Sequence, residues 1–238
     1  MTEDYNADIA HHYNAYRPPL HQLILAKCLK PGGAYSNGLD IGSGTGQSSI
    51  ALAGFCEKVT GVEPNQEMLM QAIAYPGVSY VHYDGKKLPF TDSSFDIITF
   101  AGSLFYARSQ RMLNEVVRVC QPKATIIAYD FELLFQQLPF GFHLPVEAVD
   151  YDHRANFSGL EMNGLRETNS FVSDYQLTVS TEELGHLLLS ARSFYEYFAE
   201  RYSSSEPFVL LVKELSNHAD THSIGARLYA TNYIVSKK

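Results

Sequence analysis

The chain alternates short apolar runs with segments whose apolar residues recur at helical spacing. Apolar runs and period-two alternation predict strands at residues 39–41, 58–63, 78–83, 97–100, 125–130, 175–180 and 224–235. Apolar residues three and four apart predict helices at residues 19–29, 48–55, 112–119, 181–189 and 207–217, and one that starts after residue 64. Strands and helices in this alternation are typical of an α/β fold built on a parallel sheet. The 97–100 run has almost no polar residue, so we expect it in the middle of the sheet.

A glycine-rich turn follows the first predicted strand. Gly42, Gly44 and Gly46 stand at alternate positions, where the missing Cβ lets the chain turn sharply. The helix after the turn presents unpaired backbone N–H groups to a ligand above the loop. A dinucleotide fingerprint needs its third glycine at position 47, which is Gln47. The spacing therefore argues against a nicotinamide-dependent oxidoreductase, which is the second class of function to consider.

Acidic and small residues stand where further strands end. Glu63 closes the 58–63 strand 19 residues after Gly44, close to the spacing at which a carboxylate meets ribose hydroxyls. A carboxylate accepts from two hydroxyls at once; the alternative is a solvated glutamate at a strand end. Asp84 follows the 78–83 strand, and 101–106 follow the 97–100 strand. Because ligands bind outside the carboxyl ends of parallel strands, we expect these residues to face a ligand.

These pieces together resemble a known family. The run Asp-x-Gly-x-Gly-x-Gly at 40–46, the acid at 63, and Asp-x-x-x-Leu-Pro-Phe at 84–90 are similar, in this order, to class I S-adenosylmethionine (SAM) methyltransferases of the small-molecule, methyltransferase-domain 11/25-like branch. The resemblance implies a Rossmann-like three-layer sandwich with a mostly parallel seven-stranded sheet, an antiparallel last strand and a lid insertion after strand five. It also implies SAM as cofactor and a small-molecule methyl acceptor as partner.

The resemblance further implies cofactor-binding roles. Asp40 would hold the methionyl amino group, Glu63 the ribose, and Asp84 the adenine amino group. Met68 would contact the adenine, or is plain core. Arg17, in a Tyr-Arg-Pro segment similar to that of family members, would pair with the SAM carboxylate, or is simply solvated. The full implied set is Arg17, Asp40, Gly42, Ser43, Gly44, Gly46, Gln47, Glu63, Pro64, Met68, Asp84, Gly85, Ala101, Gly102 and Ser103.

The acceptor side is less clearly marked. We expect residues 1–238 to form one methyltransferase domain, with cap helices in 1–30 and a substrate lid at 131–173. A surface subdomain with its own small core would explain the rings of that insertion equally well. Many family members carry a histidine near residue 106, where this chain has Phe105 and Tyr106. The catalytic candidates are therefore Tyr106, whose phenol has a reference pKa of about 10 and is a poor base near neutrality, and His153 of the insertion.

The composition and charge of the chain limit the kinds of partner that it can bind. The 238 residues carry a net charge of −8 with no Lys/Arg cluster, which disfavours binding along nucleic-acid phosphates. Three cysteines stand singly among apolar neighbours without metal-ligand spacing, so we predict no metal site. We see no signal peptide and no membrane-spanning run, and expect a cytoplasmic monomer or homodimer. An RNA or protein methyltransferase and a non-catalytic SAM-binding protein remain alternatives.

Overall fold

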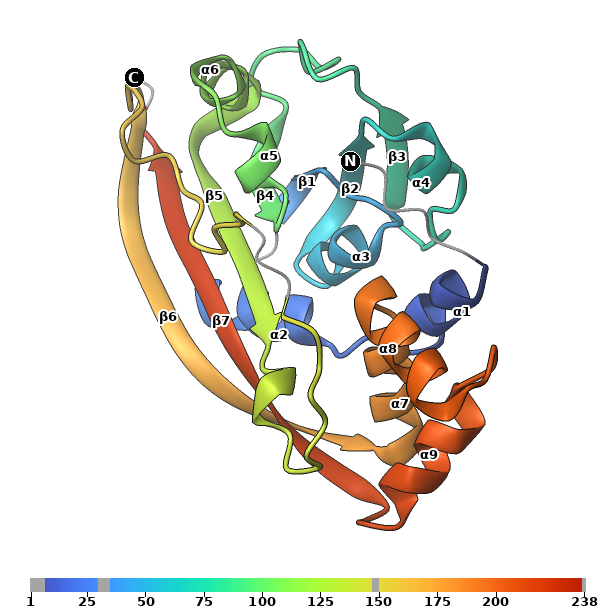
Figure 1. The fold of residues 1–238 in the computed structure, drawn as a ribbon. Coiled ribbons are helices and arrows are strands. Elements are labelled where there is room, and N and C mark those ends of the chain that lie inside the picture. Colours follow the sequence, from blue (N-terminus) through green and yellow to red (C-terminus); the bar gives the residue numbers. More distant parts are fainter. Residues whose placement is uncertain (1–6, 30–34, 147–149, 237–238) are drawn as a thin grey trace. The chain divides into compact units, whose positions relative to one another are not determined.

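The computed structural model describes residues 7–29, 35–146 and 150–236. Within them seven strands form one sheet in the order β3-β2-β1-β4-β5-β7-β6 (Figure 1). Their bounds are β1 Tyr35–Ile41, β2 Cys56–Glu63, β3 Val78–His82, β4 Phe95–Ala101, β5 Cys120–Leu133, β6 Leu165–Ser180 and β7 Thr221–Val235. The pairs β1–β2, β2–β3, β1–β4 and β4–β5 are parallel. The last strand, β7, lies between β5 and β6 and runs antiparallel to both, which confirms the predicted fold class (Figure 1).

Helices connect and cover the strands. Their bounds are α1 Ala7–Ala15, α2 Leu20–Cys28, α3 Gln47–Ala53, α4 Gln66–Met70, α5 Leu104–Ala107, α6 Gln110–Val119, α7 Thr181–Leu189, α8 Arg192–Tyr202 and α9 Phe208–Ser216, with a 3-10 turn at Phe135–Gln137. The sequence pattern did not predict α8, because its aromatic residues occupy consecutive positions and blur the helical period. Nor did it predict the first half of β6, where most side chains are exposed on an edge strand and no alternation shows.

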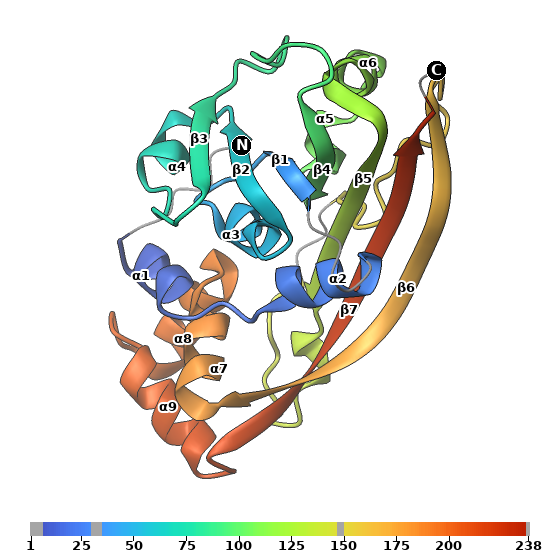
Figure 2. The same ribbon diagram turned by 180° about the vertical axis from the view of Figure 1, so that it is seen from behind.

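Successive side chains of the central strands pack on opposite faces of the sheet. Ile98 and Phe100 of β4 share a buried cluster with Met112 and Val116 of α6. Their neighbour Ile97 is equally buried but lies outside that cluster, since it points to the other face. Figures 1 and 2 show α2 and α6 on opposite sides of the sheet. The helix–sheet–helix layering implied by the family resemblance is thus confirmed.

The chain divides into two compact units. Unit 1 comprises Met1–Pro18, Leu133–Asp150 and Asp174–Arg227; unit 2 comprises Pro19–Glu132, Tyr151–Ser173 and Leu228–Lys238. Unit 1 holds α1 and α7 to α9, and unit 2 holds the glycine turn and the parallel strands. Of the predicted cap at 1–30, residues 1–6 and 30 lie outside the described part of the chain. A single domain stays a prediction.

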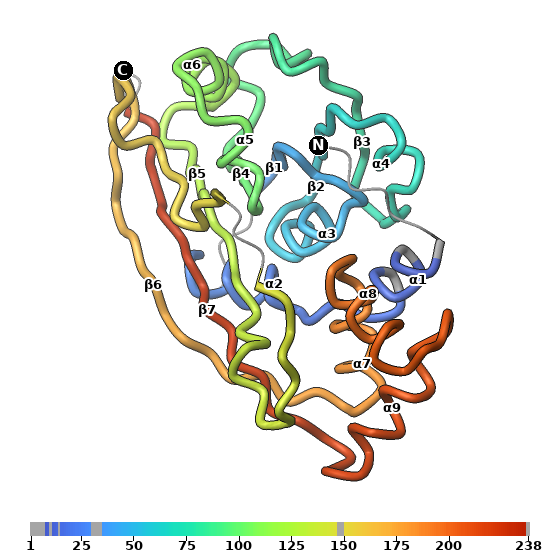
Figure 3. The backbone as a smooth tube through the Cα atoms, in the orientation of Figure 1, coloured from blue at the N-terminus to red at the C-terminus, as the bar shows by residue number. Residues whose placement is uncertain are grey.

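The predicted lid at 131–173 is divided between the two units. Rings of its first half pack within unit 1: Phe142 lies 5.2 Å from Phe198 and Phe135 lies 5.6 Å from Phe194, centroid to centroid. These rings therefore pack on α8, which lies outside the insertion, and the lid stays a prediction. The 151–164 segment belongs to unit 2 and runs beside β5 and α5–α6 (Figure 3). Arg108 after α5 anchors it by donating from Nε to the Asn156 carbonyl at 2.7 Å.

Candidate cofactor and acceptor site

The glycine turn follows β1 and adopts a backbone that suits glycine alone. Gly42, Gly44 and Gly46 have φ values of 76°, 54° and 98°. A Cβ at Gly42 would collide with the Ser103 side chain, whose hydroxyl donates to the Ile41 carbonyl, and a Cβ at Gly46 would collide with Tyr80. The two outer glycines therefore allow close packing.

The middle of the turn is open. A Cβ at Gly44 would meet only the Met68 sulfur, at 4.0 Å. Met68 is 37% exposed, so it is a surface residue beside the turn and not core. Pro64 is exposed, while Ser43 is buried beside Gly61. The turn thus leaves room for a ligand above Gly44, with an apolar side chain next to it.

Glu63 ends β2 beside this turn, and its carboxylate is held by the backbone. One oxygen accepts from the Gly44 N–H and the other from the Asn65 N–H, each at 2.9 Å. The residue is 6% exposed. Because each carboxylate oxygen has more than one lone pair, both can still accept a hydroxyl proton. The arrangement is a fixed acceptor pair beside an open turn.

Asp40 lies beneath the turn and is fully buried. Its carboxylate accepts from the hydroxyls of Ser48 at 2.5 Å, Ser49 at 2.7 Å and Thr99 at 2.9 Å. Burial raises the pKa of this carboxyl group, and the three hydroxyls oppose that shift. In this geometry Asp40 ties β1 to α3, which begins at Gln47, and to β4. Its direct contact with a methionyl amino group stays a prediction.

The Asp-x-x-x-Leu-Pro-Phe run has an exposed half and a buried half. The exposed Asp84 accepts from the Lys86 N–H at 3.0 Å, next to Gly85 with φ of 79°. Leu88 is fully buried, and the Phe90 ring lies 4.9 Å from that of Phe95. The run therefore anchors its apolar half in the core and leaves the Asp84 carboxylate exposed, in an ion pair with Lys86 at 3.7 Å.

The end of β4 meets a polar cluster. After Ala101, Gly102 turns with φ of 71°, and its carbonyl accepts from the Tyr151 hydroxyl at 2.7 Å. That hydroxyl also lies 2.8 Å from Asp130 Oδ2, which accepts from His153 Nδ1 at 2.8 Å. The other Asp130 oxygen accepts from the Phe131 N–H at 2.7 Å. Residues 102, 130, 151 and 153 thus form one connected cluster, hereafter the Asp130 cluster.

Hydrogen bonding and burial set the protonation states of this cluster. The hydrogen bond to Asp130 raises the pKa of His153 above its ordinary value of 6.5. An ionised carboxylate only accepts, so Nδ1 carries a proton and neutral His153 has its lone pair on Nε2. The His153 ring stacks on Tyr229 at 5.5 Å and 8°. Burial raises the pKa of Tyr151, which keeps it protonated near neutrality.

The two predicted catalytic residues differ in setting. Tyr106 on α5 is 79% exposed, and its ring lies 5.8 Å from that of Tyr151. His153 belongs to the Asp130 cluster and has a carboxylate partner. The sequence analysis gave Asp130 no role, and it included Tyr151 only as a residue of the predicted lid. Asp130 ends the predicted 125–130 strand, so the strand-end argument used for Glu63 would have found it.

Arg17 belongs to unit 1, whereas the other predicted cofactor residues belong to unit 2. Its guanidinium lies 3.3 Å from the centre of the Tyr13 ring, a cation–π contact within unit 1. Pairing between Arg17 and a SAM carboxylate stays a prediction.

Two features are absent from the described residues. No group of three or more His, Cys, Asp or Glu residues in this part of the chain is arranged to hold a metal ion. In the same residues, no helix has both the length and the apolar character needed to cross a bilayer.

The sheet order, the glycine turn after β1 and the acid after β2 define a Rossmann-like α/β protein. Residues 39–128 match the family model described as a methyltransferase domain. A protein from Anaeromyxobacter dehalogenans, described as a candidate type II methyltransferase, has a similar structure: the TM-score is 0.62 at 18% identity, covering 92% of this chain and 97% of that one. Residues 39–128 thus resemble methyltransferase domains, and the structural match shows the same kind of fold.

Curated relatives carry methyltransferase names. A demethylmenaquinone methyltransferase of Staphylococcus aureus is 28% identical over 172 residues, which is 66% of this chain and 70% of the relative. A sterol 4-C-methyltransferase of Caenorhabditis elegans is 37% identical over 100 residues, 39% of this chain and 30% of the relative. The chain spans less than half the length of several curated relatives that it matches.

Proposed function

We propose that this protein transfers the methyl group of SAM to a small-molecule acceptor. The observation that carries the proposal is the Glu63 carboxylate, held by the backbone N–H groups of Gly44 and Asn65 beside a turn open above Gly44. This is a preformed place for a ribose diol, because each oxygen keeps a lone pair for one hydroxyl. The residues present therefore fit an adenosyl group.

The remaining strand ends supply the other contacts of the cofactor. Asp84, exposed after β3, would accept from the adenine amino group, and Met68 would cover the purine. The turn at 42–46 would lie against the methionine part. When bound, SAM supplies a methyl group already activated on a sulfonium. The protein therefore needs to position an acceptor and exclude water, which in well-oriented systems contributes roughly 7–11 kcal/mol.

The Asp130 cluster would serve the acceptor. His153 Nε2 would take a proton from the acceptor as its atom attacks, while Asp130 holds Nδ1–H and so fixes the ring orientation and tautomer. Tyr151 links Asp130 to the Gly102 carbonyl at the end of β4 and fixes the carboxylate. A positioned base of this kind contributes typically about 10²–10⁴-fold.

Charge and relatives favour a small acceptor. A net charge of −8 opposes binding along a polyanion, and no Lys/Arg cluster offsets it. The relatives compared above are named for quinone and sterol methylation. Both kinds of acceptor are small molecules.

Calorimetry with SAM and S-adenosylhomocysteine (SAH) tests the cofactor half. We expect both to bind, and no binding at high micromolar ligand would overturn the proposal. A radioactive-methyl assay against a metabolite extract, bulk RNA and bulk protein tests the acceptor half. We expect label only in the small-molecule fraction. Label in RNA or protein alone would show that the methyl acceptor belongs to that class of molecule instead.

A further inference from the structure

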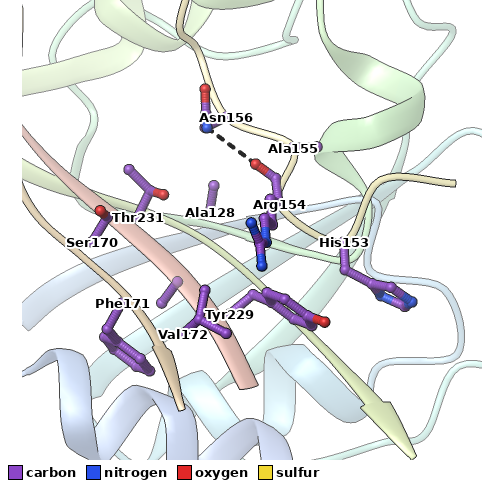
Figure 4. Close-up of a pocket in the computed structure, with 11 residues that line it drawn as sticks. Ala128, His153, Arg154, Ala155, Asn156, Ser170, Phe171, Val172, Tyr229 and Thr231 are labelled. Carbon is purple, nitrogen blue, oxygen red and sulfur yellow. Dashed lines mark hydrogen bonds between the residues drawn. The ribbon is translucent and has the colours of Figure 1, made fainter. Parts of the chain in front are cut away.

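A pocket of about 320 Å³ lies in unit 2 between the 153–156 segment and the strands β5, β6 and β7 (Figure 4). Its volume is at the lower end of the range for small-molecule sites. None of the residues that line it is among those that the family resemblance implies for the cofactor. It borders the Asp130 cluster through His153, which belongs to both.

The charge of the pocket is one-sided. Arg154 and His153 line it, and no aspartate or glutamate does. His153 is balanced by Asp130, with which it forms an ion pair when protonated. Among the described residues, no carboxylate forms an ion pair with the Arg154 guanidinium. The nearby acids have other partners: Asp152 accepts from the backbone N–H of Arg154 at 2.8 Å, and Glu132 accepts from the Tyr229 hydroxyl at 3.1 Å.

Arg154 is held in place by a ring and not by an acid. Its guanidinium carbon lies 5.9 Å from the centre of the Tyr229 ring, and Figure 4 shows Arg154 and His153 on either side of Tyr229. Such a cation–π contact orients a guanidinium and leaves its N–H fork available. The fork matches the two oxygens of a carboxylate.

The other residues that line the pocket limit the size and polarity of the ligand that it can hold. Phe171 and Val172 of β6 and three alanines provide apolar surface, while Ser170, Thr231 and Asn156 provide hydrogen-bonding groups. A pocket of this size and mixed polarity suits a compact molecule. It does not offer the long apolar surface that a sterol or polyprenyl chain requires.

We propose that this pocket is the acceptor subsite and that it binds a small carboxylate with an apolar or aromatic body, whose carboxylate pairs with Arg154. The assignment as an acceptor subsite rests on the proposed function; carboxylate binding does not. A ligand held there lies next to His153, whose Nδ1 is bonded to Asp130 and through it linked to the end of β4. Substrate recognition and the proposed base thus share one side of the sheet.

Saturation-transfer NMR and calorimetry with benzoate and its neutral isostere benzamide test this, with SAH present. We expect wild-type protein to bind benzoate at least about tenfold more tightly than benzamide, and Arg154→Ala to remove that preference. Arg154→Lys should keep only part of it, since an ammonium lacks the planar fork. Arg166→Ala is the matched control: Arg166 is also exposed, lies on β6, and does not line the pocket.

Three results would overturn the proposal: no benzoate binding at millimolar ligand, equal affinity for benzoate and benzamide, or an Arg154→Ala protein that binds benzoate like wild type. SAH affinity is measured separately on each protein. If wild type fails to bind SAH, the proposed function fails; if SAH binds normally and benzoate does not, only the carboxylate subsite fails. Circular dichroism melts confirm that the variants are folded.

Discussion

The sharpest test of the cofactor site is Glu63→Gln. In the structure both carboxylate oxygens accept from backbone N–H groups, those of Gly44 and Asn65. The glutamine amide keeps one acceptor and replaces the other by an NH₂ donor. That donor then faces a backbone N–H, so one of the two hydrogen bonds is lost and two donors oppose each other. The change alters the chemistry of the group with almost no change in shape.

The size of the effect follows from the bonds lost. A hydrogen bond to a charged group contributes about 1.5–3 kcal/mol net. The variant loses one such bond to a ribose hydroxyl, which corresponds to roughly 10- to 150-fold weaker binding of SAH. It also loses one bond to the backbone, so the free energy of unfolding without ligand should fall by about 1–3 kcal/mol.

Calorimetry with SAH measures the affinity, and urea unfolding measures the stability. Glu67→Gln is the matched control, because Glu67 is exposed on α4 only four residues away and makes the same charge change. Its affinity for SAH should equal that of wild type. If Glu63→Gln binds SAH within about threefold of wild type, less than one charged hydrogen bond has been lost and the ribose assignment is wrong.

Four further predictions concern residues of unit 2. If His153 acts as a base, activity in a pH–rate profile should rise with pH through a midpoint above 6.5. Asp130→Asn should move this midpoint to lower pH, because the hydrogen bond to Asp130 raises the pKa of His153. Because the pKa of His153 is higher in the folded protein than in the unfolded chain, protonation of His153 stabilises the fold. The free energy of unfolding of wild type should therefore exceed that of His153→Gln most below pH 6.5, and the difference should shrink as the pH rises through the folded pKa. Gly42→Ala should lower the free energy of unfolding by about 1–3 kcal/mol and by more than Gly44→Ala, because only the former meets a side chain closely; equal losses would contradict the packing argument. Asp40→Asn should reduce stability, because three hydroxyls donate to the carboxylate, and should also weaken SAH binding through the predicted contact with the methionyl amino group; unchanged SAH affinity would contradict that contact.

Local pattern was sufficient for most of the fold. The apolar runs and the alternation that predicted the parallel strands are confirmed. The central strand β4 is buried on both faces and has a continuous apolar signature, whereas the edge strand β3 shows alternation. The pattern failed at α8, and at the start of β6, where the side chains are exposed and carry no periodic signal. Pairing within the sheet decides those residues. The division of the 131–173 insertion between two units likewise depends on contacts far apart in the chain, such as Phe142 with Phe198.

Some features of the candidate site were likewise predictable from the sequence, whereas others depend on the tertiary structure. The order of glycines, the acid at 63 and the acid at 84 were readable because each lies next to its own strand, and strand ends share one edge of a parallel sheet. Only the tertiary structure showed that the Asp40 carboxylate is occupied by Ser48, Ser49 and Thr99. It alone joined residues 102, 130, 151 and 153 into one cluster and placed Arg154 at a pocket. Spacing along a chain determines which groups reach a strand end, whereas their hydrogen-bond partners depend on which distant segments fold against them.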